Sequence, residues 1–232
     1  MPKDQIPEAP SPSASTSFGI YESFRIVIPG VYTATLALLL YWAAIARYFA
    51  APLPAGVIIV GFLFFALVSG FTLYAKETPK RRKAFLENQP SRHLSTRAKL
   101  SKSLPLLDEA EAQRLYFYLL NTHFPPAFHN KVFFFGAVYY IMTQLRRVSL
   151  SFAVLGTALV GVAAVQSASP SDLQAPAVFA ISVWIVYLLN IRYNKADRKM
   201  QENYNDQILW MEMNQDLVDQ VIRSYALKTR KS

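Results

Sequence analysis

The 232-residue sequence contains no cysteine and few charged residues. Without cysteine, the chain can form no disulfide framework, no thiolate metal site and no cysteine nucleophile. Charged residues make up 17% of the chain, whereas about a quarter is typical of soluble domains. Hydrophobic residues make up 53%, which disfavours a disordered chain, because such chains are poor in Leu, Ile, Val and Phe. The composition therefore favours a membrane protein.

The sequence also lacks the motifs that mark common catalytic and nucleotide-binding sites. G-x-x-x-x-G-K-[ST], G-x-G-x-x-G and G-x-S-x-G do not occur, so no phosphate cradle or nucleophile elbow is predicted. His123 and His129 are separated by two prolines, so they cannot share one helical face as an H-E-x-x-H zinc site requires. We therefore predict no catalytic residue, no metal site and no cofactor.

Four long segments are free of Asp, Glu, Lys and Arg. A membrane-spanning helix needs roughly 20 mostly apolar residues. Prolines in the short connections 50–55 and 166–176 predict that consecutive spans turn back on each other. We predict an all-α polytopic membrane protein with four transmembrane helices in two hairpins, 21–76 and 148–192, and a helical cytoplasmic cap. The uncharged segments are 26–46, 48–75, 148–171 and 173–191, with 21, 28, 24 and 19 residues.

The distribution of cations predicts the orientation. Residues 76–147 hold 13 Lys and Arg and the tail from residue 192 holds 8, whereas the two hairpin connections hold only Arg47, at the edge of the first. Because Lys and Arg accumulate on the cytoplasmic side, both termini and the middle region are predicted to be cytoplasmic, in the plasma (inner) membrane. Residues 1–20, rich in Pro and Ser, lack the order of a cleavable signal peptide and predict a disordered cytoplasmic tail.

The region 77–131 is predicted to be a basic cytoplasmic loop that includes an amphipathic helix. Residues 76–104 hold nine cations and two acids, a net charge of +7. These cations either only fix topology or also bind anionic lipid headgroups. Nucleic acid is disfavoured, because Phe85 is the only aromatic residue among the cations and single strands need stacking platforms. The candidate anion- or headgroup-binding residues are Lys80, Arg81, Arg82, Lys83, Arg92, Arg97, Lys99 and Lys102.

Two further helices are predicted before the second hairpin. Asp108 followed by Glu111 predicts a capping box at the start of a helix that ends before Pro125. The uncharged run within 132–147 is too short to span a bilayer, so we predict an interfacial helix there. The alternative is one long helix over 132–165.

The tail 193–232 is predicted to be a cytoplasmic amphipathic helix. Its apolar residues form one stripe, and five acids with no Lys or Arg lie between residues 200 and 222. The acids either face the basic segment, within a subunit or between neighbours, or the stripe simply packs on residues 106–119. Gln215 lies within the stripe, and a polar residue in an apolar seam can fix the register in which two helices pack or their oligomeric state. The candidate residues for oligomer or cap packing are Tyr204, Ile208, Met211, Gln215, Val218 and Ile222.

Three function classes remain. The sequence favours a non-enzymatic integral membrane protein whose cytoplasmic cap binds a protein partner or an acidic ligand, as a scaffold, regulator or accessory subunit. The second class is an oligomeric membrane-perturbing effector or channel of the bacterial defence or toxin type, since small residues in the spans permit a homo-oligomer as well as one bundle. A pump is disfavoured, because no ionisable residue lies in the apolar part of a span and such residues usually mark ion or proton pathways. The third is an interface enzyme using His93, His123 or His129 with Asp108 or Glu109.

Overall fold

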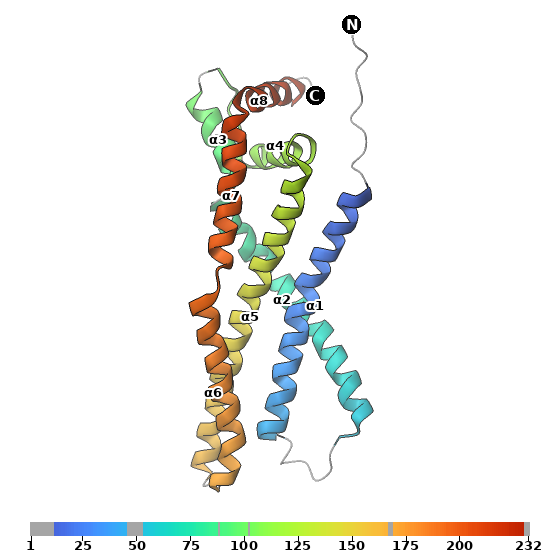
Figure 1. Cartoon of the computed structure of the whole chain (residues 1–232), viewed down its shortest axis with the longest axis vertical. Helices are drawn as coiled ribbons and strands as arrows, with labels where there is room; N and C mark the ends of the chain where they lie inside the picture. Colours follow the sequence, from blue (N-terminus) through green and yellow to red (C-terminus); the bar gives the residue numbers. More distant parts are fainter. Residues whose placement is uncertain (1–11, 46–52, 88, 102, 167–168, 230–232) are drawn as a thin grey trace. The chain divides into compact units, whose positions relative to one another are not determined.

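The computed structural model describes residues 12–45, 53–87, 89–101, 103–166 and 169–229, and these residues form helices and short connections without a strand (Figure 1). Four of the helical segments are long and apolar enough to cross a membrane, as the sequence predicts. The helices are α1 (Pro12–Leu40), the π-helical η1 (Tyr41–Ile45), α2 (Ala55–Glu87), α3 (Pro90–Leu100), α4 (Glu109–Thr122), α5 (Pro126–Val165), α6 (Pro170–Tyr193), α7 (Ala196–Met213) and α8 (Gln215–Thr229).

Three predicted boundaries differ from the structure. Residues 132–147 are not a separate helix, because they form part of α5, a continuous helix of 40 residues, which was the alternative. The C-terminal tail is two helices rather than one, with a break at Asn214. Helix α1 begins at Pro12, so residues 12–20 of the predicted disordered tail are helical, while residues 1–11 lie outside the described part.

The chain divides into two compact units. The long-helix unit comprises Glu22–Pro79 and Ala137–Asp197. The α4 unit comprises Lys80–Gly136 and Arg198–Ser232, together with the N-terminal residues up to Tyr21. We describe each unit by itself.

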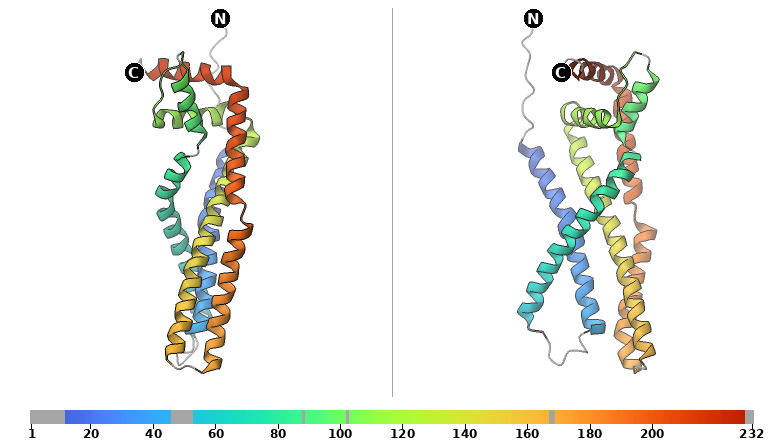
Figure 2. Two further views of the ribbon diagram at one scale, coloured as in Figure 1. Left: turned by 90° about the vertical axis from the view of Figure 1, so that its left-hand side faces the viewer. Right: turned by 180° about the vertical axis from the view of Figure 1, so that it is seen from behind.

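In the long-helix unit, α1 and α2 cross in close contact at two glycines (Figure 2). A Cβ atom added at Gly30 would lie 2.1 Å from the backbone oxygen of Ala66, and one added at Gly70 would lie 2.4 Å from that of Ile26. Ile26 of α1 meets Gly70 of α2, whereas Gly30, which comes later in α1, meets Ala66, which comes earlier in α2. The two helices therefore run antiparallel. Only glycine lets the backbones approach this closely.

Helices α5 and α6 also pack through a small residue. Gly156 of α5 lies against the ring of Phe179 and the side chain of Ala180 on α6, at 3.1 to 3.3 Å from an added Cβ. The Trp184 indole N–H donates to the Thr157 hydroxyl at 3.0 Å. These contacts place small residues where two apolar helices meet, as in membrane helix pairs.

The α4 unit has its own apolar core. The predicted capping box at the start of α4 is confirmed: the Glu111 backbone N–H donates to the Asp108 carboxylate at 2.7 Å, and the Asp108 backbone N–H donates to the Glu111 side chain at 3.0 Å. The rings of Phe124 and Trp210 stack with centroids 4.0 Å apart. The buried cluster contains Leu94, Ala98, Leu104, Leu107, Ala112, Leu115, Tyr116, Leu119, Leu120, Phe124, Met211, Val218 and Ile222.

Candidate functional site

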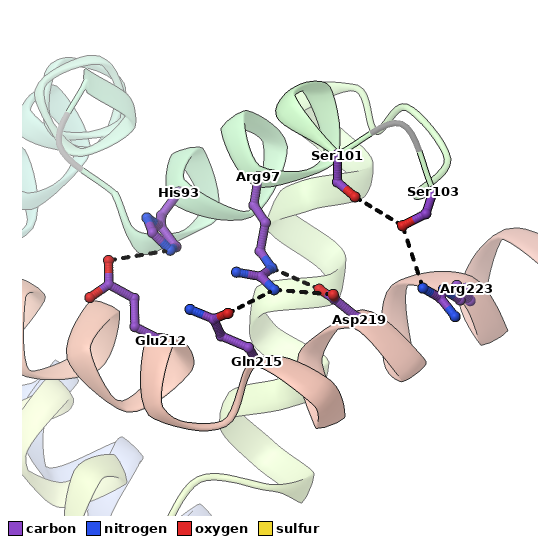
Figure 3. A network of polar contacts seen from close by, with 8 residues as sticks. All are labelled: His93, Arg97, Ser101, Ser103, Glu212, Gln215, Asp219 and Arg223. Carbon is purple, nitrogen blue, oxygen red and sulfur yellow. Dashed lines mark hydrogen bonds and ion pairs between the residues drawn. The ribbon is translucent and has the colours of Figure 1, made fainter.

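The candidate site is a polar network where α3 lies beside the end of α7 and the start of α8, within the α4 unit (Figure 3). Pro90 starts α3, as suits the first turn of a helix. Leu94 and Ala98, one turn apart, are buried in the core and fix the inward face of the helix. Arg97 therefore stands at the flank of α3, beside α8.

Arg97 makes a two-point contact with Asp219 of α8. Its Nε donates to Oδ1 at 2.7 Å and its terminal nitrogen donates to Oδ2 at 3.1 Å. Each side chain is 23% exposed, so the pair is partly shielded from water. The hydrogen bonds to Asp219 raise the pKa of Arg97, which keeps the guanidinium charged. The charges of the pair cancel locally, so the pair joins two helices and leaves little net attraction for an external anion.

His93 extends the network toward α7. Its Nε2 lies 4.0 Å from a carboxylate oxygen of Glu212. Burial lowers the pKa of His93; Glu212 opposes this effect and Arg97 adds to it. Near neutral pH His93 is therefore mostly uncharged and polar.

An open pocket of about 340 Å³ lies over this network. Its exposed lining is mostly apolar and includes Leu100, and hydroxyl, amide and carboxylate groups with one guanidinium lie among it, so the pocket suits a molecule or partner side chain that is largely apolar with a few hydrogen-bonding groups. The lining residues include His93, Thr96, Arg97, Ser101, Glu212 and Gln215.

The structure describes only part of the predicted anion-binding set. Arg92 and Lys99 are exposed on α3, whereas Arg97 is engaged by Asp219. The side chains of Lys80, Arg81, Arg82 and Lys83, in the C-terminal part of α2, and residue Lys102 lie outside the described part of the structure.

Most residues predicted for cap packing are buried in the α4 unit. Met211, Val218 and Ile222 belong to its core, and Ile208 packs against it. Tyr204 is buried on α7. Gln215 is different: it is exposed at the first residue of α8, where its side-chain oxygen accepts a weak 3.4 Å hydrogen bond from Arg97. The break at Asn214 takes Gln215 out of the apolar stripe.

Of the two predicted arrangements of the tail, packing of the stripe is seen within the α4 unit, whereas facing of the acids and the basic segment stays a prediction beyond the single Arg97–Asp219 pair. The stripe packs on Leu107, Leu115 and Leu119, which lie in the predicted segment, and Arg97 of the basic segment pairs with Asp219. Apolar packing dominates by area, because the cluster holds many buried side chains and the described α3–α8 contact holds one close ion pair.

A polar cluster around the buried Arg25 in the long-helix unit was not predicted from the sequence. Arg25 is 5% exposed and pairs with Glu22 on α1, and the Tyr74 hydroxyl of α2 donates to Glu22 at 2.7 Å. The Tyr74 ring also meets that of Tyr140 on α5 edge-on, with centroids 6.0 Å apart. The spacing of Glu22 and Arg25, three residues apart at the start of an apolar run, is the signal that could have revealed the pair.

The described residues contain no group of three or more acidic or histidine side chains able to hold a metal ion. Asp108 of the enzyme alternative is engaged as the cap of α4. Comparison with protein-family models, with curated proteins and with solved structures finds no significant match to this chain.

Proposed function

We propose that this chain is a non-enzymatic integral membrane protein, with two transmembrane hairpins, whose cytoplasmic cap of α3, α4, α7 and α8 binds a partner or an acidic ligand. In this role it acts as a membrane scaffold, regulator or accessory subunit. The observation that carries the proposal is the exposed apolar surface of the long helices, for example Val60 and Phe64 of α2, each 68% exposed. Soluble monomers rarely expose such a continuous apolar surface, whereas lipid solvates it.

The α4 unit supports the binding role. Its helices close their own apolar core, so its polar surface is available for recognition. The pocket beside Arg97 offers several hydrogen-bonding groups, and the exposed cations Arg92 and Lys99 lie on the same helix. Cations close to a bilayer attract anionic headgroups by about 1 kcal/mol each.

Single-cysteine labelling tests the membrane arrangement, because the natural chain has no cysteine. Asp172→Cys at the start of α6 and Thr96→Cys on α3 are treated with a membrane-impermeant maleimide from each side of sealed vesicles. We expect them to react from opposite sides, the second from the cytoplasmic side. Reaction of both cysteines from one side would overturn the topology, and recovery of the chain in solution without detergent would overturn the membrane assignment.

The headgroup interaction is tested in nanodiscs of phosphatidylcholine with and without phosphatidylserine. Anionic lipid should raise the melting temperature of the wild-type chain, because a ligand that binds the folded state stabilises it. Replacing Lys80, Arg81, Arg82 and Lys83 with Gln should remove this gain. The control replaces three cations elsewhere in the chain, Lys195, Arg198 and Lys199, with Gln. An equal gain in the quadruple variant would show that these cations only set orientation.

The Glu22–Arg25 pair, in which Arg25 is buried and Glu22 half-buried, favours a second candidate, the membrane-perturbing effector or channel. Ionisable residues buried within membrane helices commonly mark ion pathways. If this function holds, vesicles containing the chain should leak ions, and Glu22→Gln should change the leak. Vesicles that stay sealed under all conditions would leave the scaffold function as the better account.

A further inference from the structure

The pocket between α3 and the α7–α8 junction combines apolar walls with charged groups at its rim. Its volume is about 340 Å³, and an apolar cavity of about 150 Å³ already holds benzene, so a long side chain fits. Leu100 forms part of the apolar wall and is 81% exposed. His93, Arg97 and Leu100 are spaced by four and three residues, so they lie on the one face of α3 that lines the pocket. The cations Arg92 and Lys99 of the same helix do not line it.

Acidic side chains outnumber basic ones around this pocket. Glu212, Asp216 and Asp219 each raise the pKa of Arg97, so three carboxylates lie near this one guanidinium. Arg223 follows one turn after Asp219 on α8 and lines a different pocket. With Arg223 included, three carboxylates and two guanidinium groups leave a net charge of −1. The local charge therefore favours a cationic ligand group over an anionic one.

Glu212 is the carboxylate that this pocket offers to a ligand. Asp219 is already engaged by Arg97 through two hydrogen bonds (Figure 3). In the described part of the chain, the ion-pair partner of Glu212 is His93, whose Nε2 lies 4.0 Å away. Burial lowers the pKa of His93, so this partner is mostly uncharged near neutral pH. The Glu212 side chain is 49% exposed and can be reached from outside.

An arginine side chain of another protein matches these features. Its methylene groups can cover the apolar wall while its charged head stays at the rim. Its planar guanidinium donates two parallel hydrogen bonds to one carboxylate, and it is less strongly hydrated than the ammonium of lysine, so it enters a mostly apolar pocket more readily. Arginine is also enriched in protein interfaces, whereas lysine is depleted.

We propose that this pocket is the docking site for an arginine side chain of a partner protein, with the guanidinium on Glu212 and the methylene groups against Leu100. The inference rests on the proposed partner-binding role of the cap and gives the chemistry of the partner at this contact. Apart from Arg97, the residues predicted to bind anions are not part of this pocket.

Ligand-observed NMR on the full-length protein in phosphatidylcholine nanodiscs tests the site. The probe is N-acetyl-arginine amide, which carries an arginine side chain and no backbone charge. The matched control is N-acetyl-citrulline amide, which has nearly the same shape and no charge. Saturation-transfer titrations should give the arginine compound a dissociation constant about tenfold lower, because its hydrogen bonds to a carboxylate are charge-assisted. Equal binding of the two compounds, or binding of neither, would overturn the proposal.

Two further probes decide which kind of group the pocket selects. N-acetyl-lysine amide should bind more weakly than the arginine compound, because an ammonium cannot make the two parallel hydrogen bonds. N-acetyl-glutamate amide should bind more weakly still, because the local charge repels it. Tighter binding of the lysine compound would assign the pocket to an ammonium group, and tighter binding of the glutamate compound would make it an anion site. Either result would contradict the proposal.

Substitutions test the two contacts separately. Glu212→Gln should weaken binding of N-acetyl-arginine amide about tenfold, whereas Glu202→Gln, the same change on the same helix outside the pocket, should not. Leu100→Ser should weaken binding about threefold by removing apolar contact. Its control is Leu106→Ser, at a 75% exposed position of the α4 unit. Melting temperatures check that the variants fold, and unchanged binding by a folded Glu212→Gln variant would refute the contact.

Protection of a cysteine locates the bound probe. Thr96 is exposed and lines the pocket, so N-acetyl-arginine amide should slow the reaction of Thr96→Cys with maleimide. Asn205→Cys, exposed on α7 and outside the pocket, is the control and should react at an unchanged rate. Equal effects on both cysteines would place the probe elsewhere and would overturn the assignment.

The outcome is separable from that of the proposed function. If the arginine compound shows no preference over citrulline while Asp172→Cys and Thr96→Cys still react from opposite sides of the membrane, the pocket assignment is wrong and the membrane arrangement stands. If those two cysteines react from the same side, the topology is wrong whatever the arginine compound does.

Discussion

The ion pair of Arg97 and Asp219 contributes to the stability of the α4 unit. Exposed ion pairs contribute about 0 to 1 kcal/mol, because water and salt screen them and the side chains lose entropy. This pair has two hydrogen bonds and is only 23% exposed on each side, which places it at the upper end of that range. It also joins helices that are 122 residues apart in the sequence.

We predict a coupling energy of about 1 kcal/mol between Arg97 and Asp219. Arg97→Gln, Asp219→Asn and the double variant are compared by thermal unfolding in low and high salt. The coupling should decrease in high salt, because the Debye length falls from about 10 Å at 0.1 M to 3 Å at 1 M. The control is Arg198→Gln, which removes an exposed partner of Glu202 elsewhere. A coupling of zero in low salt would show that the pair has no stabilising role.

His93 should make the α4 unit less stable in mild acid. Its pKa is lowered by burial below the ordinary value of about 6.5, so at and below that pH the unfolded chain binds a proton more readily than the folded one. The resulting stability is present above pH 6.5 and is lost as the pH falls through the folded pKa. Glu212 and Arg97 are the charged groups beside it.

His93→Gln should therefore lose less thermal stability than the wild type between pH 7.5 and pH 5.5, two values chosen on either side of about 6.5. The melting temperatures of the two proteins at both pH values give the measurement. Equal losses in both proteins would assign the acid sensitivity to other groups.

Individual residues were predictable from sequence where the interaction is local. The capping box of Asp108 and Glu111 joins groups three residues apart, and a spacing rule is sufficient to find it. The partner of Arg97 could only be narrowed to a set of acids, because pairing across a long sequence separation depends on how the helices pack.

At the scale of elements, the α1–α2 crossing depends on glycine at two positions. A methyl group at Gly30 would meet the backbone oxygen of Ala66, which cannot rotate away as a side chain could. Gly61, on α2, has no described neighbour within 4 Å of an added Cβ. The two glycines have the same intrinsic helix propensity, so comparing them isolates the contact.

We predict that Gly30→Ala destabilises the long-helix unit by about 1 to 3 kcal/mol, as overpacking of a close contact does. Gly61→Ala should be neutral or slightly stabilising, because alanine favours helix by up to about 1 kcal/mol. Thermal unfolding in detergent compares the two variants. If both behave alike, the close backbone approach at Gly30 is not important for stability.

The break between α7 and α8 was not predictable from the periodicity of the apolar residues. The apolar stripe continues from Met211 to Val218 across the break, and no glycine or proline marks it. At Asn214 both the backbone and the side-chain N–H donate to the carbonyl of Trp210, at 3.1 and 2.8 Å, and α8 turns away from α7 (Figure 2). Such side-chain competition for a helical carbonyl is invisible to a count of apolar positions.

For the molecule as a whole, the counts of uncharged residues predicted the four long apolar helices, because a bilayer sets a minimum length that few soluble helices meet. They did not predict the division into two units. The buried Arg25 was also missed, because it borders the apolar run and only the packing of neighbouring helices shows that it is buried.

We predict that the chain stays with the membrane after washing in alkaline carbonate and enters solution only with detergent. The physical reason is that many large apolar side chains of the long helices are exposed. Centrifugation after each treatment gives the measurement. Release by carbonate alone would show that the chain is peripheral.

The stacking of Trp210 on Phe124 gives the α4 unit a spectroscopic reporter of its own. The sequence has three tryptophans, and the other two, Trp42 and Trp184, belong to the long-helix unit. Exchanging those two for phenylalanine leaves an indole whose emission responds to solvent entry into one unit only. Fluorescence can then show whether the two halves of this chain melt together or in succession.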